Sequence, residues 1–306
     1  MNYRVFSILV LALALPLLTV SAYADSISIG TAAPFGVLGE AGVTNTGPSV
    51  IHGSVAGSSG TPAVTGFPPG SVVAPGVLYT AGVANSGPGT PFGDALAAYN
   101  YAAGLSGTNE GTSGLGSGGL GATLVSALTT GVYSFTSSTV LLNGTLFLNA
   151  GGNSNASWIF QVPAALTTAS ASSVQVINTG AGLFTGAITW DVGSSATLGT
   201  TTSFLGSIIS KAGDSLNNAA TIGCGRVISL NASVTLINNI ISTPDSNGKC
   251  TQTAGSGPGG SGGTIGGPTP PPVISTPEPG TLALLSSGLL AMVFLKFRKS
   301  QVSSLA

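Results

Sequence analysis

The sequence predicts an all-β fold, a β-solenoid with three-faced coils and one α-helix packed alongside. From about residue 28 to residue 243, short apolar runs of β-forming residues are broken by Gly, Asn and Ser. Near the end of this region, Leu198, Leu216 and Leu236 recur at separations of 18 and 20 residues, which is typical of one coil per repeat. Charged residues make up only 5% of the chain, against about 25% in an average soluble protein. The hydrophobic content of 43% is nevertheless high enough for a packed core.

Strand alternation predicts which residues of these repeats face outward. Successive side chains of a strand point to opposite faces, so if the three leucines are buried, the residues two positions before them are buried too. The outward residues are then small or carry hydroxyl groups: Ser195, Thr197, Gly213, Ser215, Ser233 and Thr235. Further β-rich segments recur ahead of these positions, at residues 158–162, 188–192, 208–211 and 227–230.

One inward position is occupied by Asp214, which does not suit a core. A buried carboxylate without a partner is costly. The sequence therefore leaves two alternatives: a bulge shifts the register at this strand, or the carboxyl group is hydrogen-bonded at a corner of the coil.

An alanine-rich segment at about residues 90–104 is predicted to be the helix. It has an N-cap, a proline at the first helical position and a terminating glycine, at Thr90, Pro91 and Gly104. Phe92, Leu96 and Tyr99 fall on one face and are expected to pack on the solenoid. The glycine-rich stretch 111–121 has no following helix or acidic partner, so it is predicted to be a loop.

Both ends of the chain are predicted to be sorting signals around a domain at residues 25–250. Residues 1–24 have the basic start, apolar run and small-residue cleavage site of a signal peptide. Residues 251–276 are a linker rich in Gly, Ser and Pro. Residues 277–300 begin with Pro277, Glu278 and Pro279, followed by an apolar segment and a basic cluster.

The C-terminal pattern resembles the PEP-CTERM sorting signal of Gram-negative bacteria. The resemblance implies transient membrane insertion by this segment, processing by an exosortase-type enzyme, and a location outside the cell or on its surface. A simple C-terminal membrane anchor would give the same topology. In an exported chain, the two cysteines, Cys224 and Cys250, could pair as a disulfide, and the alternative is two free thiols.

Composition excludes one class of partner and speaks against enzymes. The formal net charge is −1, and Lys211 and Arg226 are the only basic residues between residues 25 and 248, so nucleic-acid binding is excluded. The single histidine, His52, is expected to face solvent rather than serve a catalytic triad. Asp191 and Asp214 are the pair to test for glycoside hydrolysis. No cluster has metal-ligand spacing, and no cofactor is implied.

Several stretches in the body of the chain are similar to the large ice-binding protein family of bacteria, fungi and algae. They occur in family order at residues 38–48, 53–57, 65–70, 98–103, 131–133, 158–161 and 192–199. The resemblance implies a discontinuous solenoid, in which the N-terminal coils stack beside the C-terminal ones. It also implies one flat face that binds ice. The expected ice-binding residues are Thr44, Thr46, Thr167, Ser195, Thr197, Ser215, Ser233 and Thr235.

The family pattern Thr-Ala/Gly-x-Thr/Asn is degenerate in this chain, as at residues 194–197, 212–215 and 232–235. An alternative function therefore remains open, that of a structural or adhesive protein of the extracellular matrix or biofilm without ice activity. An exported polysaccharide is a candidate partner under both interpretations.

Overall fold

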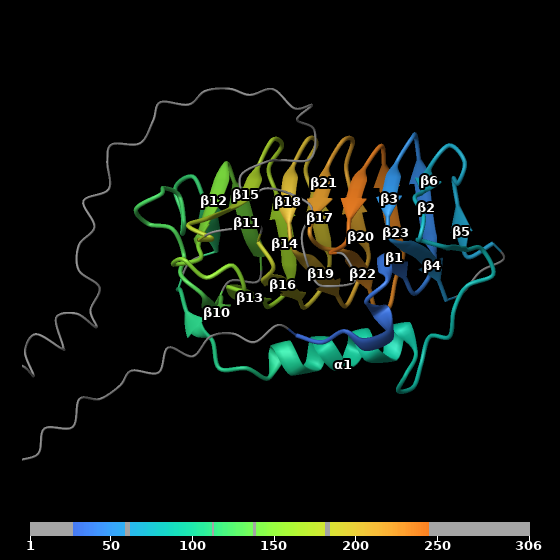
Figure 1. Cartoon of the computed structure of the whole chain (residues 1–306), viewed down its shortest axis with the longest axis horizontal. Coiled ribbons are helices and arrows are strands. Elements are labelled where there is room, and N and C mark those ends of the chain that lie inside the picture. Colours follow the sequence, from blue (N-terminus) through green and yellow to red (C-terminus); the bar gives the residue numbers. More distant parts are fainter. Residues whose placement is uncertain (1–26, 59–61, 112, 137–138, 181–183, 245–306) are drawn as a thin grey trace, which may run out of the picture. The chain divides into compact units, whose positions relative to one another are not determined.

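The computed structural model describes residues 27–58, 62–111, 113–136, 139–180 and 184–244. These residues form a β-solenoid of three parallel sheets with one α-helix running beside it (Figure 1), which confirms the predicted fold class.

Each sheet contains one strand from nearly every coil, and the bounds of the elements follow in spatial order. Sheet A consists of β7 (Leu78–Tyr79), β4 (Ser54–Gly57), β1 (Phe35–Gly39), β22 (Val227–Ser229), β19 (Ser207–Ser210), β16 (Ala187–Val192), β13 (Ser157–Val162), β10 (Gly131–Ser134) and β8 (Thr108–Asn109). Sheet B consists of β5 (Val64–Thr65), β2 (Val43–Thr46), β23 (Val234–Ile237), β20 (Asp214–Leu216), β17 (Ala196–Leu198), β14 (Ala165–Thr168), β11 (Thr139–Asn143) and β9 (Gly114–Gly116). Sheet C consists of β12 (Thr145–Asn149), β15 (Ser173–Ile177), β18 (Ser203–Leu205), β21 (Thr221–Gly223), β24 (Ile240–Ser242), β3 (Val50–His52) and β6 (Ser71–Val72). The helices are η1 (Gly30–Ala32) and α1 (Pro91–Ala103).

The order of strands in each sheet is discontinuous along the chain. The N-terminal strands β1, β2 and β3 pair with β22, β23 and β24, which are the last strands before residue 244. The chain adds a second coil outside the first, then runs past α1 to the far end of the solenoid and returns coil by coil (Figure 1). The N-terminal coils therefore stack beside the C-terminal ones, as the family resemblance implied.

Helix α1 has the predicted ends. Thr90 is the N-cap, and its hydroxyl accepts a hydrogen bond from the Gly93 amide at 3.1 Å. Pro91 is the first helical residue, and Gly104 is the C-cap. The cap residues are local in sequence, so their effect did not depend on the tertiary fold.

The prediction for the buried face of α1 was wrong at Leu96, whose side chain is 45% exposed. Phe92 and Tyr99 are buried as expected. The remaining buried positions are alanines, at Ala95, Ala98 and Ala102. Small alanine side chains let the helix backbone approach the sheet closely, so the buried face includes them and leaves Leu96 in solvent.

Sheet A differs from the other two sheets because α1 covers it. Its central strands are buried along almost their whole length, as in β1 and β22, while strands of sheets B and C alternate between buried and outward residues. Helix α1 lies along β13, β16 and β19. A second apolar cluster, separate from the core inside the coils, joins the helix to sheet A; it includes Phe35, Leu38, Phe92, Ile209 and Ile228.

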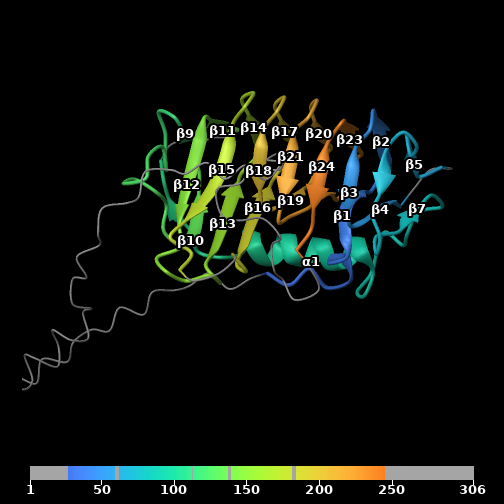
Figure 2. The ribbon, with the colours of Figure 1, turned by 45° about the horizontal axis from the view of Figure 1, so that its top comes forward.

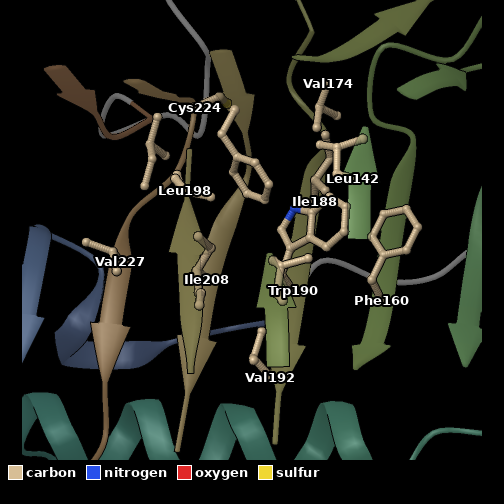
Figure 3. Close-up of a cluster of buried hydrophobic side chains, with 14 of the residues drawn as sticks. Leu142, Phe160, Val174, Ile188, Trp190, Val192, Leu198, Ile208, Cys224 and Val227 are labelled. Atoms are coloured by element: carbon tan, nitrogen blue, oxygen red, sulfur yellow. The ribbon is translucent and has the colours of Figure 1, made fainter. Parts of the chain in front are cut away.

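The core inside the coils contains a cluster of four aromatic rings from three neighbouring coils. Phe160 and Trp190, which are register partners in sheet A, stack with centroids 4.1 Å apart. Tyr133 extends the cluster on one side and Phe204 on the other. Figure 3 shows side chains of neighbouring strands, including Trp190, Leu198 and Ile208, converging on this core. Tyr133, Phe160 and Trp190 are register partners on adjacent strands, so their stacked rings help to hold these three coils together.

The prediction of a loop at the glycine-rich stretch 111–121 was wrong in part, because residues 114–116 form strand β9. Leu115 is buried, with 1% of its surface exposed, and β9 pairs with β11. Burial of Leu115, on a strand that pairs with β11, outweighs the low strand propensity of the glycines on either side of it.

Candidate functional site

The outer face of sheet B carries one hydroxyl-bearing residue from each of six neighbouring strands. They lie at the same register position, so we call them the hydroxyl row: Thr65, Thr44, Thr235, Ser215, Thr197 and Thr167. Figure 2 shows the strands that carry them, from β5 to β14, side by side. With strands about 4.8 Å apart, the row spans roughly 24 Å.

The side chains of the row point outward because the alternate residues are buried in the core. Ala196, Val234 and Leu166 lie next to row members in sequence and are fully buried. Thr44, Ser215 and Thr65 are exposed, and the other members are half-buried by their neighbours. The alternation inferred from the sequence is therefore confirmed for β17, β20 and β23.

Two more of the predicted residues, Ser195 and Ser233, form part of a parallel row. They precede Thr197 and Thr235 by two residues and lie just ahead of β17 and β23, and Gly213 holds the same position ahead of the intervening strand β20. Thr46 lies in a third row, beside Ile237 of β23. All eight predicted residues thus lie on or next to sheet B, and five of them share the central row.

Thr65 belongs to the hydroxyl row, but it was not among the residues predicted from the sequence. The signal was present, because each row member ends a triplet of a small residue, an inward residue and Thr or Ser, as in residues 42–44, 63–65 and 233–235. An alignment of these triplets would have identified Thr65, whereas the spacing of the leucines did not.

The hydroxyl row ends at β14. On the next strand, the same position is held by Leu141, which pairs with Thr167 and is 44% exposed. On β9, the partner of Leu141 is Gly114. At the β11 and β9 end of sheet B, the register position of the hydroxyl row is therefore held first by an apolar side chain and then by a glycine.

The face of sheet B is free of charge along these rows among the described residues. Asp214 lies in β20 but points inward, with 1% of its surface exposed, and burial raises its pKa to about 8. Its register is continuous with Val234, so no bulge is present, and its carboxyl group is hydrogen-bonded as the second alternative required.

The other groups considered from the sequence do not gather into a reaction centre. Asp191 lies in β16 of sheet A beside the helix, where burial raises its pKa to about 7 and the Lys211 charge opposes that rise. His52 is exposed at the end of β3. Within the described ranges, no three His, Cys, Asp or Glu side chains are grouped so that they could hold a metal ion.

Two predicted features fall partly or wholly outside the described residues. Cys224 follows β21 at the turn from sheet C to sheet A and is disulfide-bonded. Cys250, the only other cysteine of the chain, lies outside the described residues, as do Pro277, Glu278 and Pro279. In the part of the chain that the structure describes, no helix is long and apolar enough to cross a membrane.

Two family models match the chain. The model described as ice-binding-like matches residues 37–242, which include all three sheets. The model of the PEP-CTERM protein-sorting motif matches residues 275–299.

The chain is similar to several proteins called ice-binding proteins. One from Nostoc sp. (strain HG1) is 38% identical over 297 residues, which cover 97% of this chain and 96% of the relative. The crystal structure of one from an Antarctic biological consortium is 32% identical, with a TM-score of 0.62, covering 73% of this chain and 93% of that chain. The crystal structure of one from the Antarctic ascomycete Antarctomyces psychrotrophicus is 31% identical, with a TM-score of 0.60, covering 72% of this chain and all of that chain.

Proposed function

Because the chain belongs to the ice-binding-like family, we propose that it binds ice through the outer face of sheet B. The observation that carries this proposal is the hydroxyl row, six hydroxyl groups at one register position on six neighbouring strands. The alternative, a matrix or adhesion protein without ice activity, is not favoured by the family match.

The physical basis of the proposal is the match between a repeating surface and a repeating lattice. Ice presents no charge and no pocket, only regularly spaced water oxygens. Threonine combines a methyl group with a hydroxyl group, and its β-branch restricts the χ1 angle. The strands hold these groups in place before ice is met, so little conformational entropy is lost on binding. The absence of charge along the described rows helps, since ions would hold their own hydration shells.

We propose that the protein acts by binding alone and catalyses no reaction. Asp191 and Asp214, the carboxyl pair considered for glycoside hydrolysis, are each less than 5% exposed and lie on different sheets, one beside the helix and one inside the coil. A glycosidase needs both carboxyl groups at one accessible bond. This arrangement supports binding rather than hydrolysis.

The match to the sorting motif indicates a protein that is exported or held at the cell surface. We propose that an exosortase-type enzyme processes the C-terminal segment after transient membrane insertion, in a Gram-negative host. We also propose that Cys224 pairs with Cys250, which would tie the start of the linker to the corner between sheets C and A. An exported polysaccharide is a further proposed partner, since the same sorting signal would bring the protein to the cell exterior.

The test compares ice-recrystallisation inhibition and crystal shaping by purified residues 25–250 with those of a Thr197→Tyr/Thr235→Tyr variant. Two bulky rings should hold the face away from ice and lower the inhibiting activity by at least roughly tenfold, equivalent to about 1.4 kcal/mol of binding. A matched control, Thr145→Tyr/Ser203→Tyr, places the same two rings on strands β12 and β18 of sheet C, also two strands apart. A folded parent that leaves ice unshaped, or a control variant that fails as badly, would contradict the proposal.

A further inference from the structure

At the entry to strand β17 of sheet B, a backbone amide donates to a side chain instead of to a carbonyl group. At the entry to four other strands of the sheet, the corresponding amide donates to a carbonyl oxygen of the next coil. The donors and acceptors are Leu166 N to Ser195 O, Asp214 N to Ser233 O, Val234 N to Gly42 O and Val43 N to Ala63 O, at 2.9–3.0 Å. Between β17 and β20, the Ala196 amide instead donates to Asp214 Oδ1 at 2.8 Å. The carboxyl group therefore takes the place of a carbonyl oxygen between these two strands.

The second carboxyl oxygen and a backbone carbonyl oxygen both lie within hydrogen-bond distance of one serine hydroxyl group. Asp214 Oδ2 lies 2.7 Å from Ser210 Oγ, and Ser210 Oγ also lies 2.7 Å from Ala212 O. A serine hydroxyl has one proton and can donate to only one of these two oxygens. A carbonyl oxygen has no proton to give, so if Ser210 donates to Ala212 O, the short contact to Asp214 requires a proton on the carboxyl group.

We propose that Asp214 is a neutral carboxylic acid at neutral pH and a positioning residue for the hydroxyl row. It accepts from Ala196 N through Oδ1 and donates to Ser210 Oγ through Oδ2, which passes a hydrogen bond on to Ala212 O. This chain of bonds joins β17 to β20 directly beneath Thr197 and Ser215, which are register partners in the row. The functional part of this inference rests on the proposed ice-binding function.

The surroundings of Asp214 suit the neutral form. It is 1% exposed, and its ladder neighbours on either side, Ala196 and Val234, are fully buried. Burial raises the pKa of Asp214 to about 8, and the hydrogen bonds that Ser210 and Ala196 would donate to the ionised carboxylate oppose this rise.

The charged side chains in this part of the described chain are engaged elsewhere. Lys211 Nζ lies over the Tyr99 ring at 4.9 Å, on the helix side of sheet A. The Arg226 guanidinium donates to Phe35 O, Ala33 O and Ser207 Oγ. Asp191 lies in β16, in the part of sheet A that α1 follows. No described cation is thus placed to stabilise an ionised Asp214.

Two variants separate the proposed role from simple space filling. Asp214→Asn retains an acceptor for Ala196 N and a donor for Ser210 Oγ, whereas Asp214→Val, which matches Val234 on the next strand, provides neither. At pH 6, the Asn variant should keep the ice-recrystallisation inhibition of the parent, and a folded Val variant should lose roughly tenfold, a change of about 1.4 kcal/mol. Asp191→Asn is the matched control, because it changes a buried acid outside sheet B and should leave inhibition unchanged.

The proton itself is measured in the parent protein by the carboxyl-carbon NMR signal of Asp214 during a pH titration, and by urea unfolding. Between about pH 4 and pH 8, the folded state would hold a proton that the unfolded state has released, so raising pH favours unfolding. The unfolding equilibrium constant of the parent should rise, relative to that of Asp214→Asn, by up to about tenfold per pH unit in this window and level off above it.

Each outcome has a distinct meaning. A titration midpoint near 4, or parallel pH profiles of the parent and the Asn variant, would overturn the neutral acid. A folded Val variant with parental ice activity would overturn the positioning role. If the parent lacks ice activity but Asp214 titrates near 8, the proposed function fails, while the proposal that Asp214 is a neutral carboxylic acid is supported.

Discussion

Sheets B and C are built from the same coils, yet their outer faces differ in how regularly similar residues recur from strand to strand. Sheet C also has hydroxyl groups in register, at Thr145, Ser173, Ser203 and Thr221, but the next positions in that row are Ile240 and Val50. Thr145 and Ser173 are hydrogen-bonded to each other at 2.8 Å, which uses part of their bonding capacity.

The neighbouring rows make the contrast clearer. In sheet C, the row beside the hydroxyl groups holds Phe147, Gln175 and Leu205, which differ in size and polarity. In sheet B, the row two residues after the hydroxyl row includes Thr46 and Ile237, whereas the row two residues before it, just ahead of the strands, holds the small residues Ser195, Gly213 and Ser233. The comparison teaches that hydroxyl content alone does not distinguish the two faces. What distinguishes sheet B is that its hydroxyl row continues across six strands and that the row before it consists of small residues.

The largest expected effect comes from removing the core that both faces share. Trp190→Ala should lower the free energy of unfolding by about 3–5 kcal/mol, because it removes a fully buried ring that packs against both Phe160 and Phe204. Ice activity should fall only as the folded fraction falls. Urea unfolding followed by circular dichroism checks this, with Val125→Ala, at a 99% exposed position, as the silent control. Equal stability of the two variants would contradict the shared-core account.

The next effect tests the row of small residues directly. Ser195→Phe puts a ring beside the hydroxyl row, as Phe147 does on sheet C, without removing a row member. We expect a loss of roughly tenfold in ice-recrystallisation inhibition, about 1.4 kcal/mol, with little change in unfolding. Unchanged inhibition in this variant would mean that the hydroxyl groups suffice and the small residues beside them do not matter.

A smaller effect is expected from lengthening the row. Leu141→Thr would extend the hydroxyl row to a seventh strand, β11. Because each contact with ice is weak, we expect roughly a twofold gain in inhibition, worth about 0.4 kcal/mol. Leu141→Ser is the companion variant, since it supplies a hydroxyl group without the methyl group. A loss of activity on Leu141→Thr would show that the apolar end of sheet B takes part in binding.

The smallest effect on ice binding is expected at sheet A, which the helix covers. One oxygen of Asp191, Oδ1, is buried without a hydrogen-bond partner among the described residues. Burial raises the pKa of Asp191 to about 7, so the stability associated with its protonated form is lost as pH rises from about 4 to about 7. Asp191→Asn should therefore raise Tm relative to the parent at pH 8 by a few degrees and leave it nearly unchanged at pH 4. Ice activity should not change at either pH, and a thermal melt at both values checks the sign.

Local features of the sequence determined much of this molecule. Helix α1 begins and ends where Thr90, Pro91 and Gly104 predicted, because capping depends on residues within one turn. The outward positions of β17, β20 and β23 followed from alternation, since side chains of a strand must point to opposite faces.

Only the tertiary structure decided the rest. The row partner of Thr235 is Thr44, about 190 residues earlier in the chain, and the residues between them do not encode that pairing locally. The exposure of Leu96, the strand at Leu115 and the hydrogen-bonded burial of Asp214 likewise depend on what packs against each residue. The physical reason is that turn and strand preferences act between near neighbours. Stacking of coils, in contrast, is set by burying apolar surface between segments that are distant in sequence.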